Sequence, residues 1–469
     1  MTSIIKNGTI ITAGDTFRAD ILIKNGTIAA LGKDFPEQDA GEVIDALGMY
    51  IMPGGIDPHT HLDMPFGGTV SSDDFYTGHK AAAFGGTTCH IDFALQQKGG
   101  TMTDAIRTWK KKAESKAAVD YSFHVALTDP IDSSVEEIPE LLKEGVSSLK
   151  IFMAYKGVFQ VDDTTFLKTL KKSSANGLTT MVHAENGDAI ALLTEELLAA
   201  GKTAMGYHNI AHSAAIEAEA TARAVSFVEI TKAPLYIVHI ACKDGLAAVR
   251  EGRRKGLPVM GETCVQYAYL TDKLIDSADF EGAKYICSPP PKGEADRLAV
   301  WEALRDGTVQ TLATDHCPFW FDGTKEGRTP GKELGRESWA KVPNGVPGIE
   351  DRFPVMWHLG VNSGKITPNR FVELVSANPA KIFGLYPKKG SISVGSDADL
   401  VIFDPNKNHV ISAKTHHMNV DYNCYEGMNA KGWPKIVMSR GKVLVKDDQW
   451  LGEMGYGKFV ARKAFNEVL

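Results

Sequence analysis

The stretch IDPHTHLD, residues 56–63, is the first of eight short apolar runs in the middle of the chain. Stretches with helical periodicity, such as TDAIRTWKKKAESKAA and AAIEAEATARAVSFVEI, separate these runs. Buried strands that alternate with helices form a parallel sheet, and eight such units close into a barrel. The other seven runs are HIDFAL (90–95), YSFHVAL (121–127), SLKIFMAY (148–155), TTMVHAE (179–185), PLYIVHIA (234–241), PVMGETC (258–264) and QTLATDH (310–316). The sequence therefore predicts an α/β protein built on a (β/α)8 TIM-like barrel.

A doubly wound open sheet is the competing interpretation of this alternation. Such sheets commonly carry a glycine-rich phosphate loop directly after the first strand. No GxGxxG motif follows the stretch at 56–63, so the barrel is favoured.

Both ends of the chain contain short β-type runs and turn-forming pairs. Near the N-terminus, Asn7-Gly8 and Asn25-Gly26 lie between apolar runs and predict the hairpins of a small antiparallel sheet. The stretches GSDADLVIFDP and KIVMSRGKVLVKD continue this style near the C-terminus. We expect one small β-sandwich domain built from both terminal segments, with the barrel inserted between them. The predicted division is 1–52 for the N-terminal part of the sandwich, 53–384 for the catalytic barrel, and 385–469 for the C-terminal part and an oligomerisation tail.

The composition excludes several classes of protein. The chain has 469 residues, 23% of them charged, and a net charge of −7, without the basic stripe of a nucleic-acid binder. No apolar run approaches the roughly 18 residues that span a membrane, and the N-terminus lacks a signal-peptide pattern. The six cysteines form no CxxC pair, which is typical of free thiols in a reducing compartment. We expect a cytoplasmic protein that binds neither nucleic acid nor membrane.

Chemically reactive side chains fall at or near the carboxyl ends of five of the predicted strands. In a barrel, the carboxyl ends of all strands open on one face, where active sites form. A single buried histidine usually has only a packing role, but four histidines in this position are hard to explain in that way. The residues are His59, His61, Lys150, His183, His239 and Asp315. We expect all six to converge on the mouth of the barrel.

His59 and His61 are two residues apart, so their side chains point to the same side of an extended strand. Imidazole nitrogens with a carboxylate oxygen suit Zn²⁺, and Mn²⁺, Co²⁺ or Fe²⁺ also fit. An HxH pair alone does not establish a metal site, because two polar residues in a loop give the same pattern. The residues therefore predict a divalent metal site and leave the metal open.

Lys150 differs from the other five because an ammonium group has no lone pair with which to bind a metal. A lysine at a strand end or in a salt bridge would give the same pattern. Burial beside cations would lower its pKa and expose a nucleophilic amine. Such an amine can add carbon dioxide to give a carbamate that bridges two metals, which the sequence permits without requiring.

Longer motifs along essentially the whole chain resemble those of one known family. The segment MPGGIDPHTHLDMPFGGTVSSDDFYTGHKAAAFGGTT resembles dihydropyrimidinases and bacterial D-hydantoinases of the amidohydrolase superfamily. The stretches SLKIFMAYKGVFQVDD, MVHAENGD, YIVHIA, GETCVQY, FEGAKYICSPP, ATDHCPF, VPNGVPGIEDR and HHMNVDYNCYEGM resemble the same proteins in the same order. The resemblance implies hydrolytic ring opening of cyclic amides, 5,6-dihydropyrimidines or 5-substituted hydantoins, to N-carbamoyl amino acids.

The resemblance also implies a binuclear centre with two zinc ions per subunit, for which manganese or cobalt are alternatives. One metal would be held by the HxH pair with Asp315, and the other by His183 and His239. Lys150, converted by carbon dioxide to N6-carboxylysine, would bridge the two metals. A hydroxide shared by the metals would attack the ring carbonyl.

Further positions match residues that act on the substrate in the family. Tyr155 would donate a hydrogen bond to the developing oxyanion, and Asp315 would carry the proton from the hydroxide to the leaving nitrogen. The main chains of Ser288 and Asn344 would pair with the amide edges of a cyclic ureide or imide ring. Residues that would meet the exocyclic substituent, or else pack in the core, are Met64, Phe66, Phe152 and Phe159.

Two alternative functions are disfavoured. Dihydroorotases and allantoinases tend to carry an arginine shortly after the HxH pair, and the corresponding LDMPFGG has none. Relatives that act as non-catalytic scaffolds have lost metal ligands, whereas all six positions are kept here. His212-Ser213 stands where relatives commonly carry Arg-Pro, in a region that we interpret as structural. Relatives are usually homotetramers, so the resemblance also implies a homotetramer.

Overall fold

The computed structural model describes residues 2–277 and 279–465 of the chain. Its centre is a parallel sheet of eight strands whose order in space follows the order in sequence. The strands are β8 (Gly55–Thr60), β11 (Thr87–Leu95), β12 (Asp120–Ala126), β13 (Ser148–Phe152), β14 (Thr179–His183), β15 (Leu235–Ile237), β16 (Val259–Cys264) and β17 (Thr311–Ala313). Thr60 in β8 and His316 beyond β17 form a parallel bridge, so the first and last strands meet. The predicted (β/α)8 barrel is confirmed, and an open sheet is excluded.

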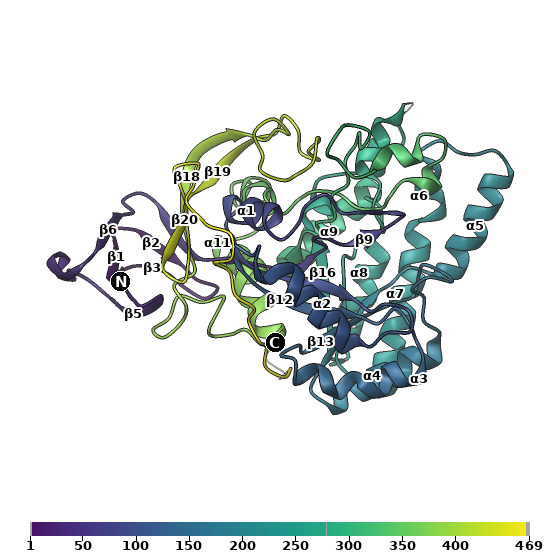
Figure 1. The fold of residues 1–469 in the computed structure, drawn as a ribbon, viewed down its shortest axis with the longest axis horizontal. Helices are drawn as coiled ribbons and strands as arrows, with labels where there is room; N and C mark the ends of the chain where they lie inside the picture. The colour runs from purple at the N-terminus through teal and green to yellow at the C-terminus, as the bar shows by residue number, and fades with distance from the viewer. Residues whose placement is uncertain (1, 278, 466–469) are drawn as a thin grey trace.

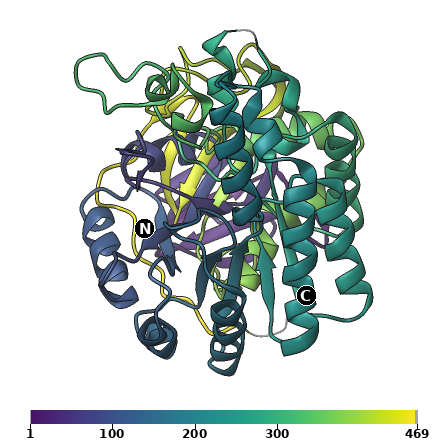
Figure 2. The same ribbon diagram turned by 90° about the vertical axis from the view of Figure 1, so that its right-hand side faces the viewer.

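Helices pack around the outside of this barrel, as Figures 1 and 2 show. The strands are buried throughout because helices cover one face and the barrel interior covers the other. None of the described helices is long and apolar enough to cross a membrane. The helices are α1 (Thr77–Phe84), α2 (Met102–Glu114), α3 (Asp132–Glu137), α4 (Asp163–Ala175), α5 (Gly187–Ala199), α6 (Tyr207–Ala211), α7 (Ala214–Thr231), α8 (Lys243–Arg254), α9 (Glu294–Asp306), α10 (Arg352–Met356), α11 (Pro368–Val372) and α12 (Asn378–Ile382).

The sandwich beside the barrel contains two sheets, seen at the left of Figure 1. One has the order β5-β4-β1-β6 and uses only N-terminal strands. The other has the order β21-β20-β19-β18-β7-β2-β3 and joins strands from both ends of the chain. Their bounds are β1 (Thr2–Lys6), β2 (Thr9–Ile11), β3 (Thr16–Arg18), β4 (Asp20–Lys24), β5 (Thr27–Gly32), β6 (Glu42–Asp45), β7 (Tyr50–Pro53), β18 (Leu400–Val410), β19 (Asn429–Ser439), β20 (Lys442–Lys446) and β21 (Gln449–Trp450). The expectation of a sandwich made from both termini is confirmed.

The two Asn-Gly pairs have different roles. Asn25-Gly26 is the predicted hairpin turn, because Lys24 pairs with Thr27 and both turn residues have positive φ, 51° and 83°. The hairpin predicted at Asn7-Gly8 is wrong, since β1 and β2 belong to different sheets. This pair carries the chain from one sheet to the other. A Cβ at Gly8 would lie 2.4 Å from Ile51 Cδ1, so the crossing requires glycine.

The end of the described chain returns from the sandwich to the barrel. The N–H of Val460 donates to the carbonyl of Tyr121 in β12 (2.7 Å), and the side chain of Arg462 donates to Ser148 Oγ in β13 (2.8 Å). Residues in the segment expected to complete the sandwich therefore also contact the barrel. The exact division of the chain at 52/53 and 384/385 stays a prediction.

Candidate metal centre and substrate pocket

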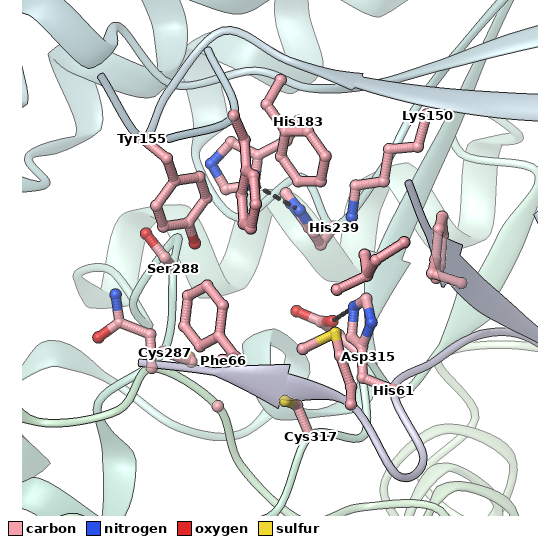
Figure 3. Close-up of a pocket in the computed structure, with 17 residues that line it drawn as sticks. His61, Phe66, Lys150, Tyr155, His183, His239, Cys287, Ser288, Asp315 and Cys317 are labelled. Carbon is pink, nitrogen blue, oxygen red and sulfur yellow. Dashed lines mark hydrogen bonds and ion pairs between the residues drawn. The ribbon is translucent and has the colours of Figure 1, made fainter. Parts of the chain in front are cut away.

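The six residues predicted from the strand ends meet at the carboxyl end of the barrel. His59 lies in β8, Lys150 in β13, and His183 is the last residue of β14. The others lie just beyond their strands; they are His61, His239 and Asp315. All of them except His59, which is fully buried, line one cavity, shown in Figure 3.

His59, His61 and Asp315 form a compact group. The Oδ1 atom of Asp315 lies 3.2 Å from His59 Nε2 and 3.1 Å from His61 Nε2. The three potential ligand atoms are close enough to one another to hold a single ion. The two histidines of the HxH pair therefore share one side of the chain, as their spacing predicts.

His183 and His239 form a second group next to the first. The Nδ1 atom of His183 lies 3.0 Å from His239 Nε2, and the ring centroids of His239 and His59 are 5.4 Å apart. Lys150 is buried beside both groups, with its Nζ atom 3.1 Å from His59 Nε2 and near His239 in Figure 3. The lysine that the sequence marked as unusual is thus surrounded by imidazoles and is not an exposed strand-end residue.

Three residues of the site have a left-handed backbone. The φ angles are +64° at Tyr155, +41° at His239 and +51° at Asp315. A side chain with a Cβ rarely adopts this conformation, and strain of about 1–3 kcal/mol persists only where the surrounding fold enforces it, often at functional sites. The fold therefore holds these three side chains toward the barrel mouth at a conformational cost.

Glu262 in β16 orients two of the histidines, and the sequence analysis missed it. Its Oε1 atom accepts hydrogen bonds from His59 Nδ1 (2.7 Å) and from the N–H of His239 (3.1 Å). Its Oε2 atom accepts one from the hydroxyl of Tyr236 (2.8 Å). Because His59 uses its Nδ1–H to donate a hydrogen bond to Glu262, its Nε2 atom carries the lone pair, and this atom lies toward Asp315 and Lys150. Histidines that bind metals are commonly held by such a carboxylate.

Burial controls the protonation of the group. It lowers the pKa of each of the four histidines, so their rings are neutral and offer lone pairs. Burial also lowers the pKa of Lys150 to about 8, so about one amine in ten is unprotonated at pH 7. Burial alone would raise the pKa of Asp315, but His59 and His61 beside it bring the pKa below its ordinary value. An ionised carboxylate and neutral imidazoles are the forms of these side chains that can bind a metal ion.

The donor set fits divalent metal ions. Neutral imidazole nitrogens and a carboxylate oxygen are the ligands that zinc prefers, and Mn²⁺ and Co²⁺ accept them as well. Burial raises the pKa of Glu262 to about 8, so this carboxyl ionises fully at neutral pH only beside a compensating positive charge. His61 Nδ1 is buried without a hydrogen-bond partner among the described residues. These clusters of histidine and aspartate are able to bind metal.

The cavity beside the candidate ligands is largely apolar on one side. The four residues predicted to line the pocket all do so; they are Met64, Phe66, Phe152 and Phe159. Tyr155 stands between this aromatic wall and the histidines, since its ring lies 5.7 Å from that of Phe66 and 5.3 Å from that of His183. Figure 3 shows its hydroxyl turned toward Ser288.

Ser288 and Asn344 also line this cavity, and Figure 3 shows Ser288 across it from Lys150 and Asp315. Among the described residues, none forms a hydrogen bond with the backbone N–H or C=O of either one. The carbonyls of Cys287 and Pro289 on either side are already occupied by side chains of the barrel (2.9 and 2.7 Å). Since backbone groups in a buried place are normally satisfied, these four groups are available to a ligand.

Glu185 is a second carboxylate that was not predicted from the sequence, and it links the candidate ligand His183 to Ser288. Its Oε2 atom accepts hydrogen bonds from His183 Nε2 (2.9 Å) and Ser288 Oγ (2.8 Å), and its Oε1 atom contacts His212 Nδ1 (3.0 Å). The region of His212, interpreted as purely structural, therefore contacts the site. A signal was available, because Glu185 follows His183 by two residues, the spacing of the HxH pair.

Comparison with known proteins agrees with this geometry. The sequence profile of the Amidohydrolase family matches residues 50–444. A D-hydantoinase of Geobacillus stearothermophilus is 50% identical over 100% of this chain and 98% of its own, and a dihydropyrimidinase of Rattus norvegicus is 40% identical over 99% and 90%. The crystal structure of a dihydropyrimidinase from Brevibacillus agri superposes with a TM-score of 0.97 at 48% identity, covering 100% of both chains. The chain belongs to the dihydropyrimidinase and D-hydantoinase family of amidohydrolases.

Proposed function

We propose that this protein opens cyclic ureide rings, 5,6-dihydropyrimidines or 5-substituted hydantoins, by hydrolysis to N-carbamoyl amino acids. One observation carries the proposal. A largely buried group of four histidines, a lysine and an aspartate lies at the same cavity as Ser288 and Asn344, whose backbone groups have no hydrogen-bond partner among the described residues. The histidines, lysine and aspartate form the first half of the site, which suits hydrolysis with the help of metal ions. The free backbone groups form the second half, which suits a flat ring that carries amide groups along its edge.

Two divalent ions, zinc first and manganese or cobalt as alternatives, would complete the first half. His59, His61 and Asp315 would hold one ion, and His183 and His239 would hold the other. Lys150 would bridge them as N6-carboxylysine; its lowered pKa favours the neutral amine that adds carbon dioxide. When bound, such ions lower the pKa of water toward neutrality and polarise a carbonyl oxygen.

Asp315 and Tyr155 would perform the proton transfer and the oxyanion stabilisation. Asp315 stays ionised and so can accept a proton from the attacking water and deliver it to the leaving ring nitrogen. Burial raises the pKa of Tyr155, so its hydroxyl keeps its proton and can donate it in a hydrogen bond. A donor aimed at the carbonyl oxygen stabilises the charge that develops during attack.

Ser288 and Asn344 would set the orientation of the ring. Each offers both a backbone donor and a backbone acceptor, the pattern that an N–H next to a carbonyl in a ureide requires. With the ring held there, its exocyclic substituent would meet Phe66, Phe152 or Phe159. A large aromatic wall favours bulky apolar substituents.

Relatives named for their reactions agree with this substrate class: they include D-hydantoinases, a dihydropyrimidinase and D-phenylhydantoinases. The absence of an arginine in LDMPFGG disfavours the acidic rings of a dihydroorotase-like or allantoinase-like enzyme. A non-catalytic scaffold is disfavoured because every candidate ligand is kept and faces the same cavity or its floor. The homotetramer and the cytoplasmic location stay predictions.

A substrate panel tests the proposal. Protein reconstituted with zinc or manganese is assayed against dihydrouracil, dihydrothymine and the D and L forms of a 5-phenyl- and a 5-methylhydantoin, with dihydroorotate and allantoin as controls. We expect turnover of at least one dihydropyrimidine or hydantoin and little of either control. Turnover of dihydroorotate or allantoin alone would overturn the substrate class. If the protein turned over none of these compounds and bound no metal, the proposal that it is an enzyme would be wrong.

A further inference from the structure

Lys332 is a fully buried lysine that the proposed chemistry does not use. It begins the 3₁₀ helix η6 (Lys332–Gly335), and it is 0% exposed. Its Nζ atom donates hydrogen bonds to two backbone carbonyls, those of Ile286 (2.8 Å) and Pro343 (2.7 Å). No carboxylate among the described residues forms an ion pair with it.

The two carbonyls belong to the two stretches that border the cavity. Ile286 lies two residues before Ser288, and Pro343 lies directly before Asn344. The carbonyl of Ile286 also accepts a hydrogen bond from the N–H of Gly345 (3.0 Å). One ammonium group and one backbone bond therefore join the stretch that carries Ser288 to the stretch that carries Asn344.

Such a lysine is expensive to bury. An ammonium group without an anionic partner loses its hydration, and here it gains in return its two hydrogen bonds and a distant contact with the ring of Phe319, 5.9 Å from the centroid. Burial accordingly lowers the pKa of Lys332 to about 8. A methionine of similar length would avoid this penalty but would remove the donor from the carbonyls of Ile286 and Pro343. The reason for a lysine here therefore lies in the two carbonyls that it bridges.

We propose that Lys332 is a positioning residue of the substrate pocket, which fixes the spacing between the backbone edges at Ser288 and Asn344. Its contacts occupy the neighbouring carbonyls and leave the backbone groups of those two residues free and facing the cavity. The inference rests on the proposed function, in which both edges pair with one ring. Lys332 touches neither the ring nor the candidate metal ligands.

The variant Lys332→Met keeps the length of the side chain and removes its donors. The backbone groups of Ser288 and Asn344 would bind the ring equally well in the ground state and in the transition state. If the spacing between them changes, KM should therefore rise while kcat stays nearly constant. We expect KM for the best ring of the panel to rise roughly 10- to 100-fold, the loss of one or two buried hydrogen bonds, with kcat changed less than about threefold. Bound metal per subunit should equal that of the wild type.

Lys341→Met is the matched control, since Lys341 lies in the same loop, is exposed and forms an ion pair with the exposed Glu337. Its KM and kcat should stay at the wild-type values. Lys332→Gln keeps two donors on a shorter side chain and should give an intermediate KM. It also replaces Lys332→Met if the latter does not fold.

Hydrogen exchange gives a readout that does not depend on activity. In Lys332→Met the N–H of Gly345 should exchange at least about tenfold faster, because its bond to Ile286 loses its support. Exchange in β8 and β14 should stay unchanged. If the wild type opens no ring, the proposed function fails, and this exchange still decides the role of Lys332. An unchanged KM together with an unchanged exchange rate at Gly345 would overturn the inference. A fall in kcat and in metal content at constant KM would also overturn it, and so would the failure of both Lys332 variants to fold.

Discussion

Two clusters of the described residues each bring three ligand-type side chains within the reach of one ion, but they differ in charge balance. At the barrel mouth the cluster is His59, His61 and Asp315. At the junction of barrel and sandwich it is Asp120, Asp397 and Asp399. Proximity alone would make both of them metal sites.

The difference lies in what already neutralises the carboxylates. At the junction, Lys389 lies 2.6, 2.9 and 2.7 Å from the three aspartates in order of sequence, and Arg440 lies 3.1 Å from Asp120. At the mouth, Lys150 contacts an imidazole, and burial lowers its pKa to about 8. A buried carboxylate paired with ammonium groups has no need of a metal. Neutral imidazole lone pairs around one carboxylate remain able to bind a metal.

The largest effect should come from Lys150→Ala. The variant loses the group that would bridge the two halves of the mouth cluster, so we expect metal content to fall to one ion or none per subunit and turnover to fall about a thousandfold or more. Elemental analysis and the ring-opening assay measure both. Turnover near that of the wild type would exclude the bridging carbamate.

Tyr155→Phe should have the next largest effect. The hydroxyl matters mainly when charge develops on the carbonyl oxygen, so kcat should fall about 100- to 1,000-fold while metal content stays unchanged. Steady-state kinetics separates the two parameters. A change confined to KM would place Tyr155 in substrate binding instead.

Glu262→Gln should weaken the mouth cluster without removing a ligand. An amide cannot accept all three hydrogen bonds that Glu262 receives from His59, His239 and Tyr236. We expect metal affinity to fall roughly 10- to 100-fold, as measured by competition with a chelator. Equal affinity in variant and wild type would show that the imidazoles need no orientation by this carboxylate.

Lys389→Met should separate the two clusters most clearly, because its effect on activity is the smallest. Three buried carboxylates would be left with Arg440 beside Asp120 and the exposed Lys388 beside Asp397, so the free energy of unfolding should fall by about 3–5 kcal/mol. Urea denaturation measures this loss. Metal content and kcat at a temperature where the variant is folded should equal those of the wild type, and their joint loss would mean that the junction also binds metal.

The barrel was predictable because its signal is periodic and repeated. Eight apolar runs with helices between them leave few alternatives, and each run begins or ends within a few residues of its strand. The hairpin at Asn7-Gly8 was not predictable, since a turn motif does not say which sheet the next strand joins. Only the contact of Gly8 with Ile51 in three dimensions reveals the crossing.

The meeting of the six candidate ligands at the barrel mouth was predictable because each sits at or near a strand end. Glu262 could have been noticed as the one charged residue in the apolar run PVMGETC, and Glu185 by its spacing from His183. Lys332 carried no such signal. Its role depends on two carbonyls 46 and 11 residues away in sequence, and backbone acceptors have no side-chain identity to recognise.

Anomalous X-ray diffraction at the absorption edge of the bound metal tests the central claim most directly. Crystals of the purified protein, reconstituted with zinc, should show two peaks at the barrel mouth, one among His59, His61 and Asp315 and one at His183 and His239, with none beside Lys389. A mouth without peaks after reconstitution, or a peak among Asp120, Asp397 and Asp399 instead, would contradict the assignment of the metal centre and the hydrolysis proposed from it.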